Sequence, residues 1–321
     1  MGNTIWSARF WSAYWTTMRP YLTFISGAAG LVGLAFIREP DYPRVALAFF
    51  PLFLSYGLGQ ALTDCFQMDT DALSSPYRPL VRGIISRTQV LAVSLVGLTA
   101  GVLILACLNP VILILGGLAV LGLLTYTILK RTWWGGPPWN SWIVALLPVI
   151  GRLVEEKCSL DRIFHSEDFR VFCLSVASVF FAYANFVVMG YFKDISADRK
   201  TGYRTFPVVF GWRPAAVYSD AVALAAALCA GAALYSTRRL NILGIAFFLL
   251  AASINLSAQV RIHRTRDENR AHSPIADVVR AFVLYCGAII LTLQPGWAYF
   301  FILFYFLFEF SLLRRPEQSQ V

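Results

Sequence analysis

Long apolar stretches alternate with short polar segments along the whole chain. No Asp, Glu, Lys or Arg occurs in 88–108, 111–129 or 171–192. A helix of about 20 apolar residues crosses the hydrocarbon core of a bilayer, so each of these stretches is long enough to do so. The same pattern predicts ten membrane-spanning segments, which lie near 20–37, 44–62, 88–108, 111–129, 139–155, 170–192, 213–235, 239–259, 276–293 and 296–313.

Both ends of this pattern carry additional signals. The last two spans are separated only by 294–296, whose sequence Gln-Pro-Gly is typical of a turn. A hairpin of two helices and one broken helix both fit this spacing, so we expect nine to ten transmembrane helices. Ahead of the first span, residues 1–19 are expected to form a helix on the membrane interface, because Arg9 is accompanied by the aromatic residues Trp6, Phe10, Trp11 and Trp15.

The composition is that of a membrane protein. Of the 321 residues, 58% are hydrophobic and 14% are charged, whereas soluble domains average about 45–50% and about 25%. We therefore expect residues 1–321 to form a single all-α domain, a polytopic helical bundle whose surroundings are the lipid bilayer.

The basic residues are unevenly distributed between the two faces of this bundle. If the N-terminus lies inside the cell, 19 of the 27 Lys and Arg residues fall on the inner side and eight on the outer side, as the positive-inside rule requires. The net charge of +9 then reflects topology and does not indicate nucleic-acid binding. This orientation places two longer polar loops, 63–87 and 193–213, on the cytoplasmic side of the cell (inner) membrane.

The first of these loops carries a cluster of carboxylates. Asp64 and Asp71 are seven residues apart, so on a helix that continues from the second span they would differ by about 20° around the axis and share a face. Gln67 would lie on that face between them, whereas Asp69 would point roughly away.

The second loop carries Asp194 and Asp198, which share a helix face because they are four residues apart. Carboxylates at the mouth of a membrane bundle are costly unless they are paired or bind a metal ion. Two facing pairs can hold Mg²⁺, which prefers oxygen ligands and completes its shell with water and phosphate oxygens. The alternative is that the acids merely pair with neighbouring bases at solvated helix ends. The bases that could instead contact phosphate are Arg78, Lys193, Arg199, Lys200 and Arg204.

These residues resemble the motifs of the UbiA superfamily of intramembrane prenyltransferases. That family carries Asn-Asp-x-x-Asp-x-x-x-Asp after its second helix and often Pro-Tyr-Arg-Pro beyond it, and the corresponding segments here are 63–71 and 76–79. Its second motif, Asp-x-x-x-Asp followed by Arg, Gly and Thr-x-Pro-Val, corresponds to 194–208. A Tyr-x-x-x-Lys at the inner end of the fourth helix corresponds to Tyr126 and Lys130. The order of the motifs also agrees, so the resemblance covers nearly the whole chain.

The resemblance implies a helical bundle around a central cavity that transfers an isoprenoid from a prenyl diphosphate to a small acceptor and releases diphosphate. It implies that Asp64 and Asp71, helped by Gln67, bind one Mg²⁺, and that Asp194 and Asp198 bind the other. It further implies that Tyr126 faces the allylic carbon and that diphosphate is bound by Arg78, Lys130, Lys193, Arg199 and Arg204.

Two positions depart from the family pattern and leave alternatives open. The family's Asn is Thr63 here and its central Asp is Gln67, which offers oxygen but no negative charge. A non-catalytic member of the family is therefore one alternative. A transporter is another, although its binding groups would lie near the middle of the membrane, whereas these acids lie at one face.

The identity of the acceptor is the least constrained feature. We expect an aromatic or quinone-like acceptor because such acceptors are common in the family, with a tetrapyrrole or a glycerol-phosphate lipid as the alternatives. Tyr183 and Asn185 lie in the middle of the sixth span and could hydrogen-bond an acceptor. Polar side chains at such positions equally often join neighbouring helices.

Overall fold

The computed structural model of the chain describes residues 4–156, 158–239 and 241–315, and this part contains helices and no β-strand. The predicted all-α class is confirmed. Short 3₁₀ turns (η1–η4) connect some of the helices, and the α-helices are α1 (Ala8–Met18), α2 (Thr23–Leu34), α3 (Tyr42–Asp64), α4 (Met68–Ser74), α5 (Arg87–Leu108), α6 (Val111–Lys130), α7 (Gly136–Leu153), α8 (Leu160–Phe164), α9 (Phe169–Gly190), α10 (Ile195–Lys200), α11 (Phe206–Phe210), α12 (Trp212–Ser236), α13 (Ile242–Arg264), α14 (His272–Leu293) and α15 (Ala298–Leu313).

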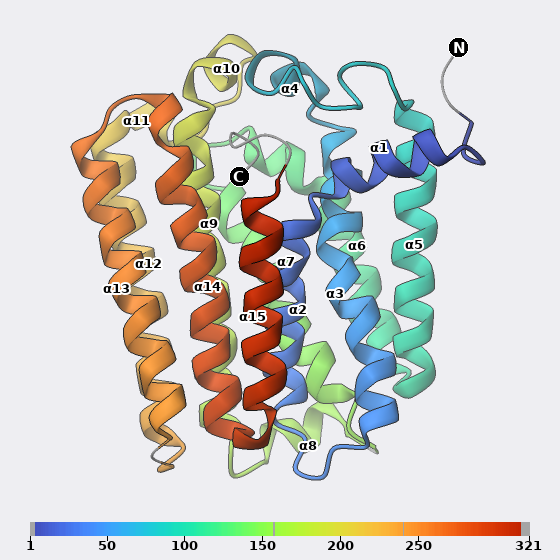
Figure 1. Cartoon of the computed structure of the whole chain (residues 1–321), viewed down its shortest axis with the longest axis vertical. Coiled ribbons are helices and arrows are strands. Elements are labelled where there is room, and N and C mark those ends of the chain that lie inside the picture. The colour runs from blue at the N-terminus through green and yellow to red at the C-terminus, as the bar shows by residue number, and fades with distance from the viewer. Residues whose placement is uncertain (1–3, 157, 240, 316–321) are drawn as a thin grey trace.

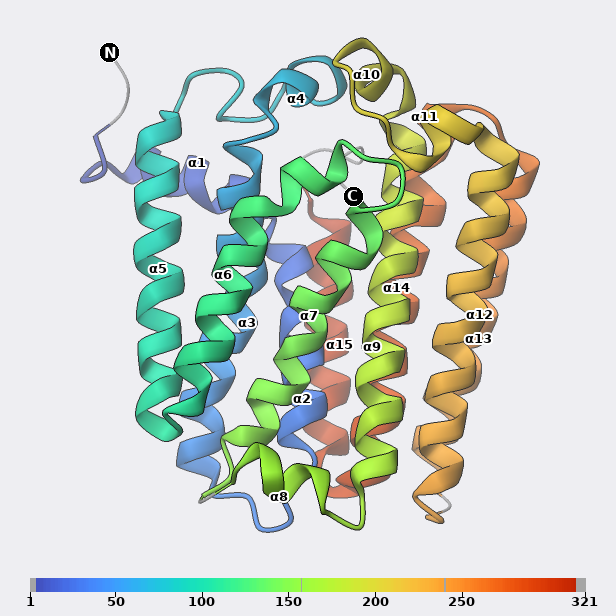
Figure 2. The same cartoon turned by 180° about the vertical axis from the view of Figure 1, so that it is seen from behind.

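Eight helices of the described chain are long and apolar enough to cross a membrane, judged by length and composition alone. They are α3, α5, α6, α9, α12, α13, α14 and α15. The other two predicted spans correspond to α2, which has 12 residues, and to α7, which has 18. Both run alongside the longer helices in the middle of the bundle (Figures 1 and 2). Each of the ten predicted spans therefore corresponds to a helix of the described chain.

The end of the described chain is a hairpin of two helices. Because Pro295 has no N–H with which to continue α14, the turn Pro295–Trp297 reverses the chain. The side-chain amide of Gln294 donates hydrogen bonds to the carbonyl oxygens of Ala35 (3.2 Å) and Ile37 (2.8 Å), which anchors the turn beside the end of α2. α14 and α15 then run in opposite directions (Figure 1), so the alternative of one broken helix is wrong.

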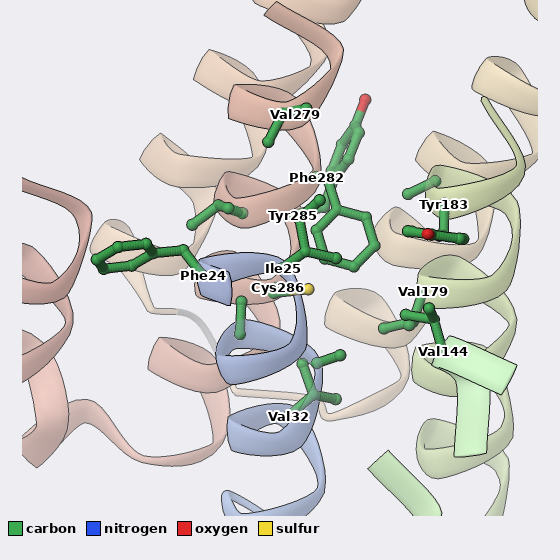
Figure 3. Packing of buried hydrophobic residues seen from close by; sticks show 14 of the residues in the cluster. Phe24, Ile25, Val32, Val144, Val179, Tyr183, Val279, Phe282, Tyr285 and Cys286 are labelled. Carbon is green, nitrogen blue, oxygen red and sulfur yellow. The ribbon is translucent and has the colours of Figure 1, made fainter. Parts of the chain in front are cut away.

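The helix α2 lies at the centre of the packing. All 12 of its residues are buried, and it contacts α3, α7 and α14. A Cβ atom at Gly33 would collide with the backbone of Pro148, and one at Gly151 would collide with the carbonyl of Gly30. These small residues let α2 and α7 approach closely, as in other membrane helix pairs. Figure 3 shows the resulting core, in which α2, α9 and α14 contribute Ile25, Val32, Val179, Phe282 and Tyr285.

The helix α1 lies across the bundle and not along it (Figure 1). Its N-terminus is capped by Ser7, whose hydroxyl oxygen accepts a hydrogen bond from the backbone N–H of Phe10. Phe10 and Tyr14 are buried, whereas Trp11 and Trp15 on the other side are about half exposed (50% and 51%). This two-sided character is typical of interfacial helices, and the location of α1 in the membrane interface stays a prediction.

Three short helices cover one end of the bundle. α4 belongs to the first polar loop, 63–87, and α10 and α11 belong to the second, 193–213. α4 and α10 contact each other, and both figures show them side by side above the long helices (Figures 1 and 2). The two loops that carry the acidic motifs therefore meet at the same end of the molecule.

Candidate active site

A cavity of about 370 Å³ lies within the bundle and reaches the end covered by α4 and α10. Most of its wall is apolar and comes from α3, α5, α6, α7 and α9. Charged and amide side chains gather in one part of the wall, which we call the charged cluster. Its members are Arg19, Gln60, Asp64, Gln67, Asp71, Arg78, Lys130, Lys193 and Asp194.

The first acidic motif reaches the cavity by a route that differs from the prediction. α3 ends at Asp64 and α4 begins only at Met68, so the predicted continuous helix through Asp71 is wrong. The two carboxylates are nevertheless brought together, because the guanidinium of Arg78 forms ion pairs with both, at 3.6 Å to Asp64 and in closer contact with Asp71. Arg19, just after α1, also pairs with Asp64 at 2.9 Å.

Burial changes the titration of these groups. Asp71 and Arg78 are both less than a tenth exposed. Removal from water raises the pKa of Asp71, and the positive charge of Arg78 only partly offsets this effect. Burial alone would lower the pKa of Arg78, but the carboxylates of Asp71 and Asp64 reverse this, so its pKa is raised. The first motif therefore needs a permanent cation beside it to remain ionised.

Gln67 is bound by a lysine. The Lys130 ammonium, at the end of α6, donates a hydrogen bond of 2.7 Å to the Gln67 side-chain oxygen. The ammonium also lies over the rings of Tyr203, at 5.3 Å, and Tyr191, at 6.0 Å, which is the distance range of a cation–π interaction. Lys130 is thereby held in one place at the wall of the cavity.

The second acidic motif has a different environment. Asp194 precedes α10 and lines the cavity, whereas Asp198 lies within α10 and is fully buried. The Asp198 carboxylate accepts hydrogen bonds from the hydroxyls of Thr70 (3.3 Å) and Thr205 (3.1 Å). Burial raises the pKa of Asp198 to about 6. Because Thr70 belongs to α4, this contact joins the two motif-bearing loops.

Two predicted phosphate ligands lie elsewhere. Arg199 lies on α10 and Arg204 in the segment after it, and both are exposed. Neither is among the described residues that line the cavity. The prediction that they contact the same ligand as Arg78 and Lys130 is therefore not supported by their position. Asp69 also lies outside the cavity wall, where it accepts hydrogen bonds from Arg131 (3.0 Å) and Tyr203 (3.2 Å).

Tyrosine side chains line the cavity next to the charged cluster. Tyr126 and Tyr183, both predicted site residues, are buried and form part of the wall. Tyr56 and Tyr191 join them there. Asn140 of α7 connects this group, because its amide donates a hydrogen bond of 3.3 Å to the Tyr183 hydroxyl. The cavity therefore passes from charged groups to aromatic faces and then to an apolar region.

Asn185 faces neighbouring helices and does not line the cavity in the described chain. Its side-chain oxygen accepts hydrogen bonds from Ser219 of α12 (2.7 Å) and Gln259 of α13 (3.1 Å), and its amide donates to Asn255 of α13 (3.0 Å). All four side chains are buried. The structure thus favours the role of interhelical contact over the predicted contact with an acceptor.

The apolar part of the cavity extends to the outer surface of the bundle. Phe50 of α3 and Ile104 of α5 line the cavity and are also 62% and 40% exposed. In a membrane such residues would face lipid. A ligand with a long hydrocarbon chain could therefore place its polar group in the charged cluster while its chain reaches the hydrocarbon core of the bilayer.

Several site residues were not assigned a role from the sequence. Arg19 lies 45 residues before its partner Asp64, and no local pattern links them. Asn140 follows a Pro-Pro pair and looks like part of a turn, although it lies on α7. Thr70 and Thr205 lie within the motif segments 63–71 and 194–208, and this proximity to the acids in sequence was the only available signal.

The second motif fits a divalent metal ion. Asp194 and Asp198 offer two carboxylates, of which Asp194 lines the cavity and Asp198 is fully buried outside its lining. The side-chain hydrogen bonds that Asp198 accepts in the described chain come from hydroxyl groups, and the nearby charge of Lys130 acts on it as well. Oxygen donors of this kind are the ligands that Mg²⁺ prefers. Binding a cation would also remove the cost of burying the Asp198 charge.

Comparison with known proteins shows to which family a chain with this arrangement belongs. Residues 23–284 match the sequence model of the UbiA prenyltransferase family. The chain belongs to this family. The matched region contains both acidic motifs and all or part of nine of the ten predicted spans, and only the last span lies wholly outside it.

Individual relatives, one compared by sequence and others by structure, agree with this assignment. The chain is 24% identical to a protein named digeranylgeranylglyceryl phosphate synthase from Pyrococcus abyssi, over 212 residues that cover 65% of this chain and 72% of the relative. The structure of a UbiA homolog from Aeropyrum pernix K1 superimposes with a TM-score of 0.72 at 23% identity, covering 84% of this chain and 97% of the other.

A second solved structure carries ligands. A UbiA homolog from Archaeoglobus fulgidus, described as bound to DMAPP and Mg²⁺, superimposes with a TM-score of 0.62 at 17% identity and covers 86% of this chain and 98% of the other. At these identities the two structures show that the fold is shared. They confirm the predicted UbiA-like helical bundle.

Proposed function

We propose that this UbiA-family chain transfers an isoprenoid from a prenyl diphosphate to a small acceptor, with Mg²⁺ as the cofactor. The observation that carries the proposal is the charged cluster at one end of an apolar cavity. Arg78, Lys130 and the two acidic motifs offer a place for a diphosphate and its metal ion, and the apolar wall offers a place for the prenyl chain. The relative from Archaeoglobus fulgidus that binds DMAPP and Mg²⁺ supports this assignment.

The chain's own residues would act on the diphosphate as follows. Lys130 and Arg78 would donate charge-assisted hydrogen bonds to the phosphate oxygens, and Lys193 on the cavity wall would add a third cation. Asp194 and Asp198 would hold the Mg²⁺, which supplies further neutralisation of the charge that develops on the leaving group.

The bond changes balance without any further reactant. The bond between the allylic carbon and the diphosphate oxygen breaks, and its electron pair leaves with diphosphate. An acceptor oxygen or carbon then forms the new bond to the allylic carbon, and the proton it loses passes to the released diphosphate. The rings of Tyr126 and Tyr183, which line the cavity, would stabilise the allylic cation by cation–π interactions.

For the acceptor we favour a glycerol-phosphate lipid. The name of the Pyrococcus abyssi relative describes a product in which a glyceryl phosphate carries two geranylgeranyl chains. The apolar arm of the cavity reaches the lipid-facing surface at Phe50 and Ile104, which is compatible with a donor or acceptor that carries a long chain. The aromatic or quinone-like acceptor predicted from the sequence gains no support from these relatives.

We also propose that the charged cluster lies on the cytoplasmic side of the cell membrane. Arg78, Lys130, Lys193 and the loops around them belong to the side that carries 19 of the 27 basic residues. Basic residues favour the cytoplasmic side of a membrane protein. The diphosphate group of the donor would then bind from the cytoplasmic side of the membrane.

A transfer assay with two acceptors tests the proposal. Purified protein in detergent would receive labelled geranylgeranyl diphosphate and Mg²⁺, with either geranylgeranylglyceryl phosphate or a phenolic acid. Labelled lipid product with the glyceryl phosphate supports the whole proposal. Product with the phenolic acid alone would keep the prenyltransferase activity and overturn the acceptor. The absence of product with either acceptor, together with no release of diphosphate, would contradict the proposed activity.

A further inference from the structure

We propose that one edge of the polar end of the bundle is a binding surface for anionic phospholipids. This surface, which we call the basic edge, is formed by residues 131–134, 204–213 and 262–266. It contains the turn after α6, the helix α11 and the adjoining ends of α12 and α13. None of its residues lines the cavity, so the inference goes beyond the proposed function and does not depend on it.

The basic edge carries four arginines that the protein leaves to its surroundings. They are Arg204, Arg213, Arg264 and Arg266, and all four are exposed. None of them forms an ion pair within the described ranges 4–156, 158–239 and 241–315. Two of these residues, Arg213 and Arg264, lie at the ends of α12 and α13.

The acids in the same region are engaged by other groups. The Asp220 carboxylate and the His263 imidazole are 2.7 Å apart. The Glu268 carboxylate accepts hydrogen bonds of 3.1 Å from the backbone N–H of Ser196. The Asp267 side chain accepts a hydrogen bond from the backbone N–H two residues further along. These acids therefore do not neutralise the four arginines, and the basic edge has a net positive charge.

Two hydrogen bonds join the parts of the basic edge into one surface. The backbone N–H of Arg204 donates to the carbonyl oxygen of Arg131 (3.1 Å), which connects the segment before α11 to the turn after α6. The indole N–H of Trp212 donates to the carbonyl oxygen of Ile262 (2.8 Å), which holds the first turn of α12 beside the last turn of α13. Figures 1 and 2 accordingly place α11, α12 and α13 at the same corner of the bundle.

Exposed aromatic rings accompany the arginines. Trp133, Trp134 and Phe210 are 44%, 56% and 45% exposed. The Trp133 ring packs edge-on against Phe210 at 5.4 Å and contacts Phe206 at 6.3 Å, so the turn after α6 and α11 present their rings together. Water alone would satisfy the arginines, but it does not favour the exposure of these rings. Tryptophan side chains are enriched where a membrane meets water.

An anionic phospholipid matches both features of the basic edge. Its phosphate can accept charge-assisted hydrogen bonds from guanidinium groups, and its glycerol and acyl region can contact the aromatic rings. α12 and α13 are both long and apolar enough to span a membrane, so lipid headgroups surround their ends. A basic residue near an anionic membrane surface strengthens binding by about fivefold, and several of them act together here.

Lipid binding can be measured without turnover. Purified protein in detergent would be mixed with equal amounts of phosphatidylglycerol and phosphatidylcholine that carry the same acyl chains, and native mass spectrometry would count the lipids bound. We expect the wild type to prefer phosphatidylglycerol. In the triple variant Arg204→Gln, Arg213→Gln, Arg264→Gln, we expect the apparent affinity for phosphatidylglycerol to fall by at least roughly tenfold, with unchanged binding of phosphatidylcholine.

A second triple variant controls for the loss of charge alone. Arg170, Arg238 and Arg239 are exposed at the opposite end of the bundle, and their replacement by Gln removes the same charge. We expect this variant to keep the preference for phosphatidylglycerol. Size-exclusion chromatography would show that both variants are folded, and higher salt should weaken the preference of the wild type because it screens exposed charges.

Every other pattern would overturn the inference. Equal binding of the two lipids by the wild type would exclude a surface for anionic lipids and favour a soluble acidic partner. A full preference in the first triple variant would show that the basic edge is not the binding surface. An equal loss in both triple variants would show an effect of net charge and not of this surface. Failure of the proposed function would appear separately, in the transfer assay.

Discussion

At the scale of single residues, the two carboxylates of the first motif are held together by one guanidinium. Arg78 contacts both carboxylates of the first motif. Removing one partner of a buried ion pair leaves an uncompensated charge and costs about 3–5 kcal/mol. We expect Arg78→Gln to lower the thermal stability of the protein in detergent and to abolish donor binding. Arg82→Gln is the matched control because Arg82 is exposed four residues further along. Equal stability of the two variants would contradict the account.

Asn185 gives a second prediction at this scale. Its side chain forms hydrogen bonds with Ser219, Asn255 and Gln259 on two other helices. Hydrogen bonds between membrane helices contribute about 0.6 kcal/mol on average and up to about 1.7. We expect Asn185→Ala to lower the free energy of unfolding by about 1–2 kcal/mol while the KM for the acceptor stays unchanged. A raised KM in a protein of normal stability would instead restore the predicted contact with the acceptor.

Single residues also show where sequence reasoning ends. The acidic motifs are visible because their members are close together in the chain, at spacings of four and seven residues. Arg19 and Asn140 contact the site from other elements, and no spacing predicts such contacts. The partners of Asn185 lie 34, 70 and 74 residues away, so its role could be decided only after the helices were placed.

At the scale of elements, the pairing of α2 with α7 depends on the absence of side chains. A Cβ at Gly33 would collide with the backbone of Pro148, and the backbone cannot move aside as a flexible side chain can. Overpacking of this kind costs about 1–3 kcal/mol. We expect Gly33→Ala to lower the melting temperature, whereas Gly117→Ala should leave it unchanged or raise it, because a Cβ at Gly117 meets open space on α6. A neutral Gly33→Ala variant would contradict this packing.

Elements were predicted well wherever hydrophobicity alone determines them. Each apolar stretch became a helix, because the backbone groups of a membrane-spanning segment must satisfy one another. The polar loops were predicted less well. The helix through Asp64 and Asp71 is interrupted between α3 and α4, and the two carboxylates are brought together by ion pairs with the guanidinium of Arg78. Apolar periodicity contains no information about such contacts.

At the scale of the whole molecule, the bundle has a polar end and an orientation that can be measured. Lys200 on α10 and Arg239 beyond α12 are exposed. In a cysteine-free background, Lys200→Cys and Arg239→Cys would be labelled with a membrane-impermeant maleimide in intact cells and in inverted vesicles. We expect Lys200→Cys to react only in inverted vesicles and Arg239→Cys only in intact cells. The reverse pattern would contradict the proposed cytoplasmic location of the charged cluster.

The central claim concerns the chemistry of the whole cavity, and Mg²⁺-dependent release of diphosphate from a prenyl diphosphate tests it most directly. The measurement would compare the wild type with Asp198→Asn and with Asp220→Asn, in which a carboxylate paired with His263 outside the cavity wall is neutralised. The account predicts that the wild type releases diphosphate only with Mg²⁺ and that Asp220→Asn releases it at a near-normal rate. The rate in Asp198→Asn should fall by at least roughly 100-fold, the scale on which the loss of one charge-stabilising group acts. Release that is independent of Mg²⁺, or equal in the two variants, would contradict it.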